Sequence, residues 1–350
     1  MTEKNTAILK DLSTIKLFVG FITTVIVTII LKALGSIFLP LFMALLLYFL
    51  FNGIVKKLVK WKIPRFLILI FLLFFIFILF YFLGILIYSS ATSFIGKFPA
   101  YSERVLDMLK NFSEKLNIPL SEVENYINNI DWTKSLDEAT ALLSNTFGSF
   151  TAFIENLLLM LVYLIFMLAG SNSMSSRLDK AFSQERSTKI KGIINDIEIE
   201  VRHYLSIKTF ISLLHGTVAA IILIIAGIDF AIFSALLISL LSFIPNIGSI
   251  IGVIFPVLIC FLQYGFSLRM LLVLGGLAIA GFVIGNVVEP RLTGKGLKLA
   301  PIVVLISLIF WGFIWGIVGM ILAVPLTSAL KICCENIPTL KPVAHLISSD

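Results

Sequence analysis

Long apolar runs alternate with short polar segments along most of the 350-residue chain. Several runs are about 18–25 residues long, and about 20 helical residues cross the hydrocarbon core of a bilayer. Backbone polar groups in lipid must be hydrogen-bonded within the protein, so such runs form helices or a closed barrel. The runs are continuous rather than alternating in polarity, which excludes a barrel. The pattern therefore predicts an all-α polytopic membrane protein.

About six apolar runs are predicted to cross the membrane once each. They comprise residues 15–31, 33–55, 66–88, 151–169, 209–228 and 270–288. The first three runs carry few polar side chains, and we interpret them as scaffold. Pro40 interrupts the second run, and the third is rich in phenylalanine.

Basic residues indicate which loops face the cytoplasm. The segment between the second and third runs contains Lys56, Lys57, Lys60, Lys62 and Arg65 and no acidic residue. We therefore place it in the cytoplasm, together with the amino and carboxyl termini.

Residues 91–150 then lie outside, and their apolar residues recur at helical spacing. This pattern predicts a small extracytoplasmic helical insert. The insert either packs on the membrane helices or neighbouring subunits, or it gates or selects substrate. Residues 190–205 form a second amphipathic stretch, predicted to be a helix along the cytoplasmic interface.

Two further apolar segments, residues 230–264 and 301–330, contain helix breakers in their middle. The breakers are Pro245, Asn246, Gly248, Gly252 and Pro256 in the first segment, and Gly312, Gly316, Gly319 and Pro325 in the second. Two crossings per segment would leave about 15–17 residues per arm, or about 22–26 Å, short of the roughly 30 Å core. Each segment is therefore predicted to be a re-entrant helical hairpin.

The two broken segments also resemble one another. Leu-Ile-Ser-Leu occurs at 237–240 and at 305–308, and a glycine follows at equal distance in both, Gly248 and Gly316. Each segment follows one ordinary crossing, so 209–264 and 270–330 are interpreted as inverted repeats. Inverted repeats with broken helices are the usual plan of secondary transporters.

These interpretations divide the chain into five parts. They are the scaffold (1–90), the outer region (91–150), the fourth crossing with the interfacial helix (151–208), the transport core (209–335) and a cytoplasmic tail (336–350).

Composition narrows the function classes. Hydrophobic residues make up 59% of the chain, charged residues 13%, and the mean hydropathy is +1.06, too apolar for a soluble domain. The net charge of +7 fits cytoplasmic loops better than nucleic-acid binding. Cys260, Cys333 and Cys334 lack metal-binding or disulfide spacing, and nucleotide-binding and hydrolase motifs are absent. We expect no enzyme activity, cofactor or metal site.

The clearest polar constellation within the apolar sequence is Asn286, Glu289 and Arg291. Asn286 and Glu289 share a helix face, and Pro290 is expected to end the helix near Glu289. Glu289 pairs either with Arg291 or with a partner elsewhere. The cluster either fixes the helix end or belongs to the substrate path. Lys208 and His215 are isolated in the sequence, and we interpret them as structural or interfacial.

The predicted transport path combines the helix breaks with this polar cluster. Its residues are Ser242, Pro245, Asn246, Gly248, Gly252, Asn286, Glu289, Arg291, Gly312, Gly316 and Pro325. Glycine pairs four residues apart, at 248/252, 281/285 and 312/316, indicate close helix packing, substrate contact or both. Antiport of a cation would need a titratable carboxylate within the membrane; Glu289, Asp229 and Glu155 are the candidates.

Several longer motifs resemble one family. They are Asn286-Val-Val-Glu-Pro-Arg-Leu-Thr-Gly-Lys-Gly-Leu, Leu299-Ala-Pro, Ile309-Phe-Trp-Gly, Val324-Pro-Leu and Phe243-Ile-Pro-Asn-Ile-Gly. Together they are similar to the signatures of the AI-2E family transporters over nearly the whole chain. The resemblance implies a transporter of the bacterial inner membrane. That family is associated with export of the quorum-sensing autoinducer-2, and some members are reported as sodium(lithium)/proton antiporters.

Two functions remain open from the sequence. The first is export of a small polar organic molecule like autoinducer-2, because an uncharged polyol-like ligand suits backbone dipoles and asparagine side chains. The alternative is sodium(lithium)/proton antiport, which the lack of paired acids within a crossing disfavours. The outer region and the glycine pairs suggest a homo-oligomer in the lipid bilayer.

Overall fold

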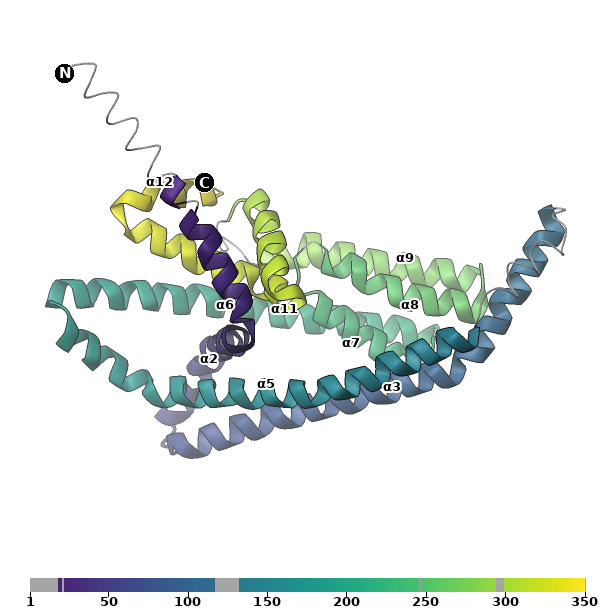
Figure 1. Cartoon of the computed structure of the whole chain (residues 1–350), viewed down its shortest axis with the longest axis horizontal. Coiled ribbons are helices and arrows are strands. Elements are labelled where there is room, and N and C mark those ends of the chain that lie inside the picture. Colours follow the sequence, from purple (N-terminus) through teal and green to yellow (C-terminus); the bar gives the residue numbers. More distant parts are fainter. Residues whose placement is uncertain (1–17, 21, 117–131, 246, 294–298, 350) are drawn as a thin grey trace, which may run out of the picture. The chain divides into compact units, whose positions relative to one another are not determined.

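The computed structural model describes residues 18–349, apart from residues 21, 117–131, 246 and 294–298. The described residues are helical nearly throughout (Figure 1). The helices are Phe18–Ala33, α2 (Gly35–Lys60), α3 (Arg65–Leu116), α5 (Trp132–Ala181), α6 (Gln184–Ile225), α7 (Ala231–Leu241), α8 (Gly248–Tyr264), α9 (Leu268–Val283), the π-helix η1 (Ile284–Val288), α10 (Glu289–Thr293), α11 (Pro301–Asn336), the 3-10 helix η2 (Pro338–Leu340) and α12 (Lys341–Ile347). The predicted all-α class is confirmed.

Several of these helices are long and apolar enough to cross a membrane. Within the described ranges they are Gly35–Lys60, Phe66–Met108, Gln184–Ile225, Leu268–Thr293 and Pro301–Asn336. A further pair, Ile154–Gly170 and Met174–Ala181, would form one more span bent by 66°. The chain is thus a polytopic helical membrane protein, as its apolar pattern predicts.

The chain folds as two compact units, which we describe separately. Unit 1 comprises Met1–Tyr48, Asn156–Ile197 and Lys298–Asp350. Unit 2 comprises Phe49–Glu155 and Glu198–Leu297. The two predicted hairpins therefore fall in different units.

Two of the helices that are longer than the sequence predicted are α3 and α6. α3 continues from the predicted third crossing to Leu116, so the described start of region 91–150 is the same helix. The predicted helix at 190–205 is present, but α6 joins it to the crossing 209–228 without a break. No glycine or proline lies between Gly192 and Gly216. Polar side chains alone do not interrupt a helical hydrogen-bond ladder, so the helix continues.

The first broken segment is a helical hairpin in unit 2. α7 and α8 lie side by side (Figure 1), and the segment that joins them begins with a turn at residues 242–245 that contains Pro245. A Cβ added at Gly248 would lie 1.7 Å from the carbonyl oxygen of Leu241, so the arms meet where only glycine fits. Pro256, in contrast, lies inside α8. The prediction that Pro256 breaks the helix is wrong. Proline lacks one backbone N–H and so removes one helical hydrogen bond, while the hydrogen bonds of the adjacent residues keep the helix intact.

The second broken segment is also a hairpin, in unit 1. α11 is interrupted at Trp315 (φ −129°, ψ 18°) and Gly316 (φ 63°, ψ −144°), where the left-handed φ favours glycine. A Cβ added at Gly319 would lie 1.9 Å from the carbonyl oxygen of Trp311, so the chain folds back tightly here. Pro325 lies inside the second arm and does not break it.

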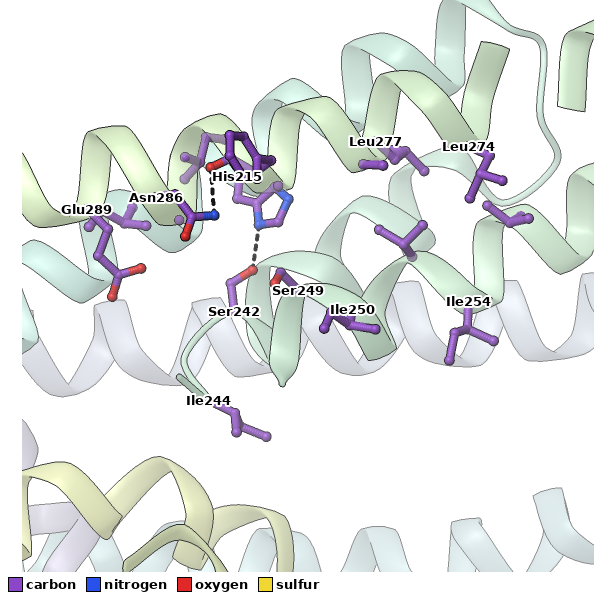
Figure 2. Close-up of a pocket in the computed structure, with 18 of the residues that line it drawn as sticks. His215, Ser242, Ile244, Ser249, Ile250, Ile254, Leu274, Leu277, Asn286 and Glu289 are labelled. Carbon is purple, nitrogen blue, oxygen red and sulfur yellow. Dashed lines mark hydrogen bonds between the residues drawn. The ribbon is translucent and has the colours of Figure 1, made fainter. Parts of the chain in front are cut away.

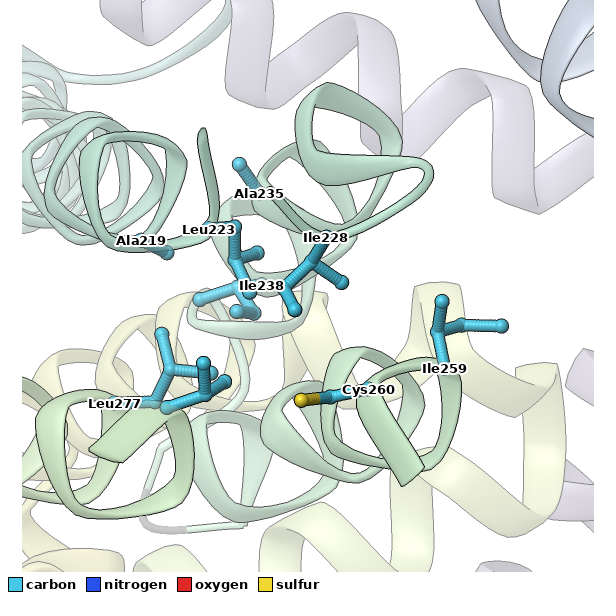
Figure 3. Close-up of a cluster of buried hydrophobic side chains, with 9 residues drawn as sticks. Ala219, Leu223, Ile228, Ala235, Ile238, Ile259, Cys260 and Leu277 are labelled. Atoms are coloured by element: carbon cyan, nitrogen blue, oxygen red, sulfur yellow. The ribbon is translucent and has the colours of Figure 1, made fainter. Parts of the chain in front are cut away.

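A buried apolar cluster holds the first hairpin in place (Figure 3). α6 contributes Ala219 and Leu223, α7 contributes Ile238, and α8 and α9 contribute Ile259 and Leu277. Each of these side chains is 0% exposed. This cluster packs four helices together next to the turn between α7 and α8.

Candidate functional site

Unit 2 contains a cavity of about 910 Å³ beside the hairpin turn. Its lining comes from α6, the turn between α7 and α8, α8, α9 and the helical segment η1–α10. Figure 2 shows a division along the cavity: His215, Ser242, Ser249, Asn286 and Glu289 lie toward one end. Ile250, Ile254, Leu274 and Leu277 lie toward the other.

An ion pair lies at the polar end. Lys208 of α6 donates a hydrogen bond to Glu289 of α10, with 2.6 Å between Nζ and Oε1. The Lys208 side chain is only 4% exposed, and a buried ammonium requires a compensating charge. This pairing decides an alternative that the sequence left open: Glu289 pairs with Lys208, while Arg291 is exposed on α10.

A second buried pair joins α6 to the hairpin. His215 is 2% exposed, and its Nδ1 lies 2.8 Å from Oγ of Ser242 at the end of α7. The Ser242 hydroxyl also donates to the carbonyl oxygen of Ile238, at 2.7 Å. His215 is thus held in one orientation by the hairpin turn (Figure 2).

Asn286 lies in a widened turn of the helix. Residues Ile284–Val288 form a π-helix, and the Asn286 amide donates to the carbonyl oxygen of Phe282 at 3.1 Å. The helix then continues through Pro290 to Thr293, so the prediction that Pro290 ends it is wrong. A π-turn shifts the hydrogen-bond register just before the proline that lacks an N–H.

The hairpin residues divide between lining and packing. Ser242 and Pro245 line the cavity, whereas Gly248 and Gly252 face the arm α7 within the hairpin. Asn246 lies outside the described residues. Close packing is therefore the role of Gly248 and Gly252, while the pair Gly281 and Gly285 lines the cavity.

The predicted path residues of the second hairpin lie in unit 1. Gly312 packs against Met320, and the break at Gly316 follows Trp315, whose indole N–H donates to the carbonyl oxygen of Leu31. Pro325 is buried within α11. All three residues therefore belong to unit 1, whereas the cavity lies in unit 2.

Asp229 lies outside the cavity lining, in the turn between α6 and α7. Its carboxylate accepts hydrogen bonds from Lys97 (2.5 Å) and Tyr101 (2.7 Å) of α3. Burial raises the pKa of Asp229, but the hydrogen bonds and nearby positive charges outweigh it and hold the pKa below its usual value. Arg104 of α3 also donates to the carbonyl oxygen of Gln263. The stretch of α3 from Lys97 to Arg104 therefore packs on the turn between α6 and α7 and on the end of α8.

The third candidate for ion coupling does not join these groups. Glu155 is exposed on α5 and is not a lining residue of the cavity. Within the described ranges, no three His, Cys, Asp or Glu side chains are grouped to hold a metal ion.

From the sequence, Lys208 and His215 were interpreted as structural or interfacial and were not among the predicted path residues. They are seven residues apart on α6, so they share one face of a helix predicted to enter the membrane. Ionisable groups on such a face are functional candidates by default. The common face of Lys208 and His215 was not recognised, because the sequence was divided between an interfacial helix and a crossing.

Comparison with known proteins identifies the family. The sequence model of the AI-2E family transporters matches residues 19–339. The chain belongs to this family. It is 30% identical to the AI-2 transport protein TqsA of Escherichia coli, over 90% of each chain. It is also 32% identical, over 94% of each chain, to a protein of Haemophilus influenzae named "Putative transport protein". The chain is therefore a transport protein of a bacterial membrane, with several helices that can span it.

Proposed function

We propose that this AI-2E family transporter exports a small polar organic molecule of the autoinducer-2 type across the bacterial inner membrane. The observation that carries the proposal is the cavity beside the hairpin turn of unit 2. Its volume of about 910 Å³ and its mixed lining suit a small organic ligand. The name of the Escherichia coli relative supplies the cargo class.

The charges in the cavity support an uncharged cargo. Lys208 and Glu289 neutralise each other at the polar end. The lining also contains the polar side chains of His215, Ser242 and Asn286, and none of these is a second carboxylic acid. A neutral ligand can bind such a site without burying an uncompensated charge.

The same ion pair disfavours cation/proton antiport. Antiport requires a carboxylate that exchanges a proton for a cation. In the described part of the chain, Glu289 is the acidic residue that lines the cavity. Its carboxylate is already paired with Lys208.

Reconstitution in liposomes tests the proposal. The purified protein is expected to transport autoinducer-2, whereas a sodium gradient is expected to produce no pH change inside the vesicles. Leu274→Trp would fill the apolar end of the cavity and should reduce transport about tenfold or more. Leu271→Trp, on the same helix but outside the lining, is the matched control. A sodium-linked pH change without movement of autoinducer-2 would contradict the proposal.

A further inference from the structure

One nitrogen atom in the cavity lacks a hydrogen-bond partner. Among the buried side-chain atoms without a partner in the described part of the chain, only Nε2 of His215 belongs to a lining residue. A buried polar atom left unpaired is unfavourable, so its place at a binding cavity requires an explanation.

The hydrogen bonds of Ser242 determine whether Nε2 of His215 is a hydrogen-bond donor or an acceptor. The Ser242 hydroxyl has one hydrogen and donates it to the carbonyl oxygen of Ile238. Its oxygen can then only accept from His215 Nδ1, which must carry the ring proton. Burial disfavours the charged ring, because an unpaired buried cation is costly. In the neutral ring Nε2 is therefore a bare hydrogen-bond acceptor.

Beside Nε2, on the side of Gly281, there is room for about one methyl group. A Cβ added at Gly281 would lie 3.7 Å from Nε2 and 3.9 Å from the Ser249 side chain. Gly281, His215 and Ser249 all line the cavity. In Figure 2 His215 and Ser249 lie between Asn286 and the apolar residues Ile250 and Ile254. A ligand that reaches His215 thus has apolar wall on one side and polar groups on the other.

We infer that His215, oriented by Ser242, determines substrate specificity by accepting a hydrogen bond from a hydroxyl group of a neutral substrate. Carbonyl and carboxylate groups cannot donate to Nε2, so the site favours hydroxyl-bearing molecules over ketones and carboxylates of similar size. This inference rests on the proposed function, because it assigns a role within the same cavity.

Nitrogen NMR tests the protonation state directly. The chain has three histidines, so protein labelled with ¹⁵N-histidine gives few signals, and His215→Asn assigns the one of interest. We expect the Nδ1-protonated form at neutral pH, and we expect erythritol, but not 2-butanone, to shift the Nε2 resonance. An Nε2-protonated ring, or no response to erythritol, would overturn the inference.

Two substitutions of His215 distinguish its role as a hydrogen-bond acceptor for the substrate from its hydrogen bond with Ser242. In His215→Asn the amide N–H can replace Nδ1 toward Ser242, but no acceptor remains at the Nε2 position. In His215→Gln the amide oxygen can lie near that position. His215→Asn should raise the autoinducer-2 concentration for half-maximal transport about tenfold, and His215→Gln should restore part of the loss.

Selectivity distinguishes this role from a structural one. The wild-type protein should prefer autoinducer-2 over an analogue lacking one hydroxyl, and His215→Asn should reduce that preference. An unchanged preference in His215→Asn contradicts the inference.

Gly281→Ala provides an independent variant. The added Cβ makes only ordinary contacts of 3.7–3.9 Å, so the fold should be retained while the space beside Nε2 is filled. We expect weaker binding of erythritol. Gly275→Ala, on the same helix with no atom within 4 Å and outside the lining, is the control. Equal binding by both variants contradicts the inference.

Failure of the inference and failure of the proposed function are distinguishable. If the wild-type protein does not move autoinducer-2, the proposed function fails, while the erythritol response of the His215 signal still decides the inference. If export proceeds with wild-type selectivity in His215→Asn, the inference fails and the proposed function stands.

Discussion

At the scale of residues, the pair Lys208 and Glu289 stands out because it joins two helices inside a cavity. The lysine is almost fully buried, whereas the side chain of Glu289 is 29% exposed. In such a pair the loss of one partner is worse than the loss of both, because a single buried charge remains uncompensated.

This asymmetry predicts a mutational result. Glu289→Gln should destabilise the protein in detergent by about 3 kcal/mol, because Lys208 then lacks its counter-charge. Adding Lys208→Met to the Glu289→Gln variant should recover much of that loss. Thermal unfolding of the single and double variants measures the coupling; additive effects of the two substitutions would show that the side chains do not depend on each other.

Asp229 gives a second prediction, for the pH dependence of stability. Its pKa in the folded protein lies below the ordinary 3.8, so folding favours the ionised carboxylate. The stability that Asp229 contributes is therefore present above about pH 4 and is lost as the pH falls through the folded-state pKa. Asp229→Asn should lower stability by about 1–2 kcal/mol at pH 7.

Acid titration of unfolding checks the sign. The difference in stability between wild-type protein and Asp229→Asn should shrink as the pH falls below about 4. A difference that grows on acidification would mean that the folded-state pKa is raised instead. Glu103→Gln, an exposed position on the same helix α3, controls for general charge effects.

At the scale of elements, the two hairpins depend on glycines at close approaches between arms. The contact at Gly248 leaves no room for a side chain, since its Cβ would overlap the Leu241 carbonyl group. The arms α7 and α8 have 11 and 17 residues, about 16 and 26 Å long. Each is shorter than the roughly 30 Å core, which supports the prediction that this hairpin enters and leaves on one side.

Gly248→Ala should therefore open the hairpin, with a loss of stability of about 3 kcal/mol or more. Gly192→Ala in α6 has no atom within 4 Å of the new Cβ and should be neutral or slightly stabilising. Yield of folded protein and thermal unfolding in detergent compare the two variants. Similar stability for both would show that the arms do not approach as closely as described.

At the scale of the whole molecule, the basic residues predict the orientation in the membrane. The segment 289–298 carries Arg291, Lys295 and Lys298, which favours the cytoplasm. If the first hairpin is re-entrant, segment 289–298 also lies on the cytoplasmic side. A single crossing by the hairpin segment would place 289–298 outside.

Cysteine labelling tests this orientation. In a variant whose native cysteines are replaced, Thr293→Cys should react with an impermeant reagent only after the cells are permeabilised. Glu103→Cys, on the exposed surface of α3, should react in intact cells. Full labelling at Thr293 without permeabilisation would contradict the predicted topology.

The sequence by itself determined the all-α membrane fold, both broken segments and the family. These features depend on local chemistry: apolar runs long enough to span lipid, and glycine or proline where a helix must turn. Gly316 and the turn beside Pro245 were therefore found where the pattern placed them. The pattern did not predict that Pro256 and Pro325 lie inside continuous helices. A proline breaks a helix only when the hydrogen bonds of the neighbouring residues cannot keep the helix together.

Only the tertiary structure decided which polar groups meet. Lys208 and Glu289 are 81 residues apart, and His215 and Ser242 are 27 apart, so no local spacing links them. Their pairing arises because apolar packing of α6 to α9 brings these helices together, and that packing has no fixed sequence separation. The same packing forms the cavity beside the first hairpin, and the second hairpin belongs to the other unit.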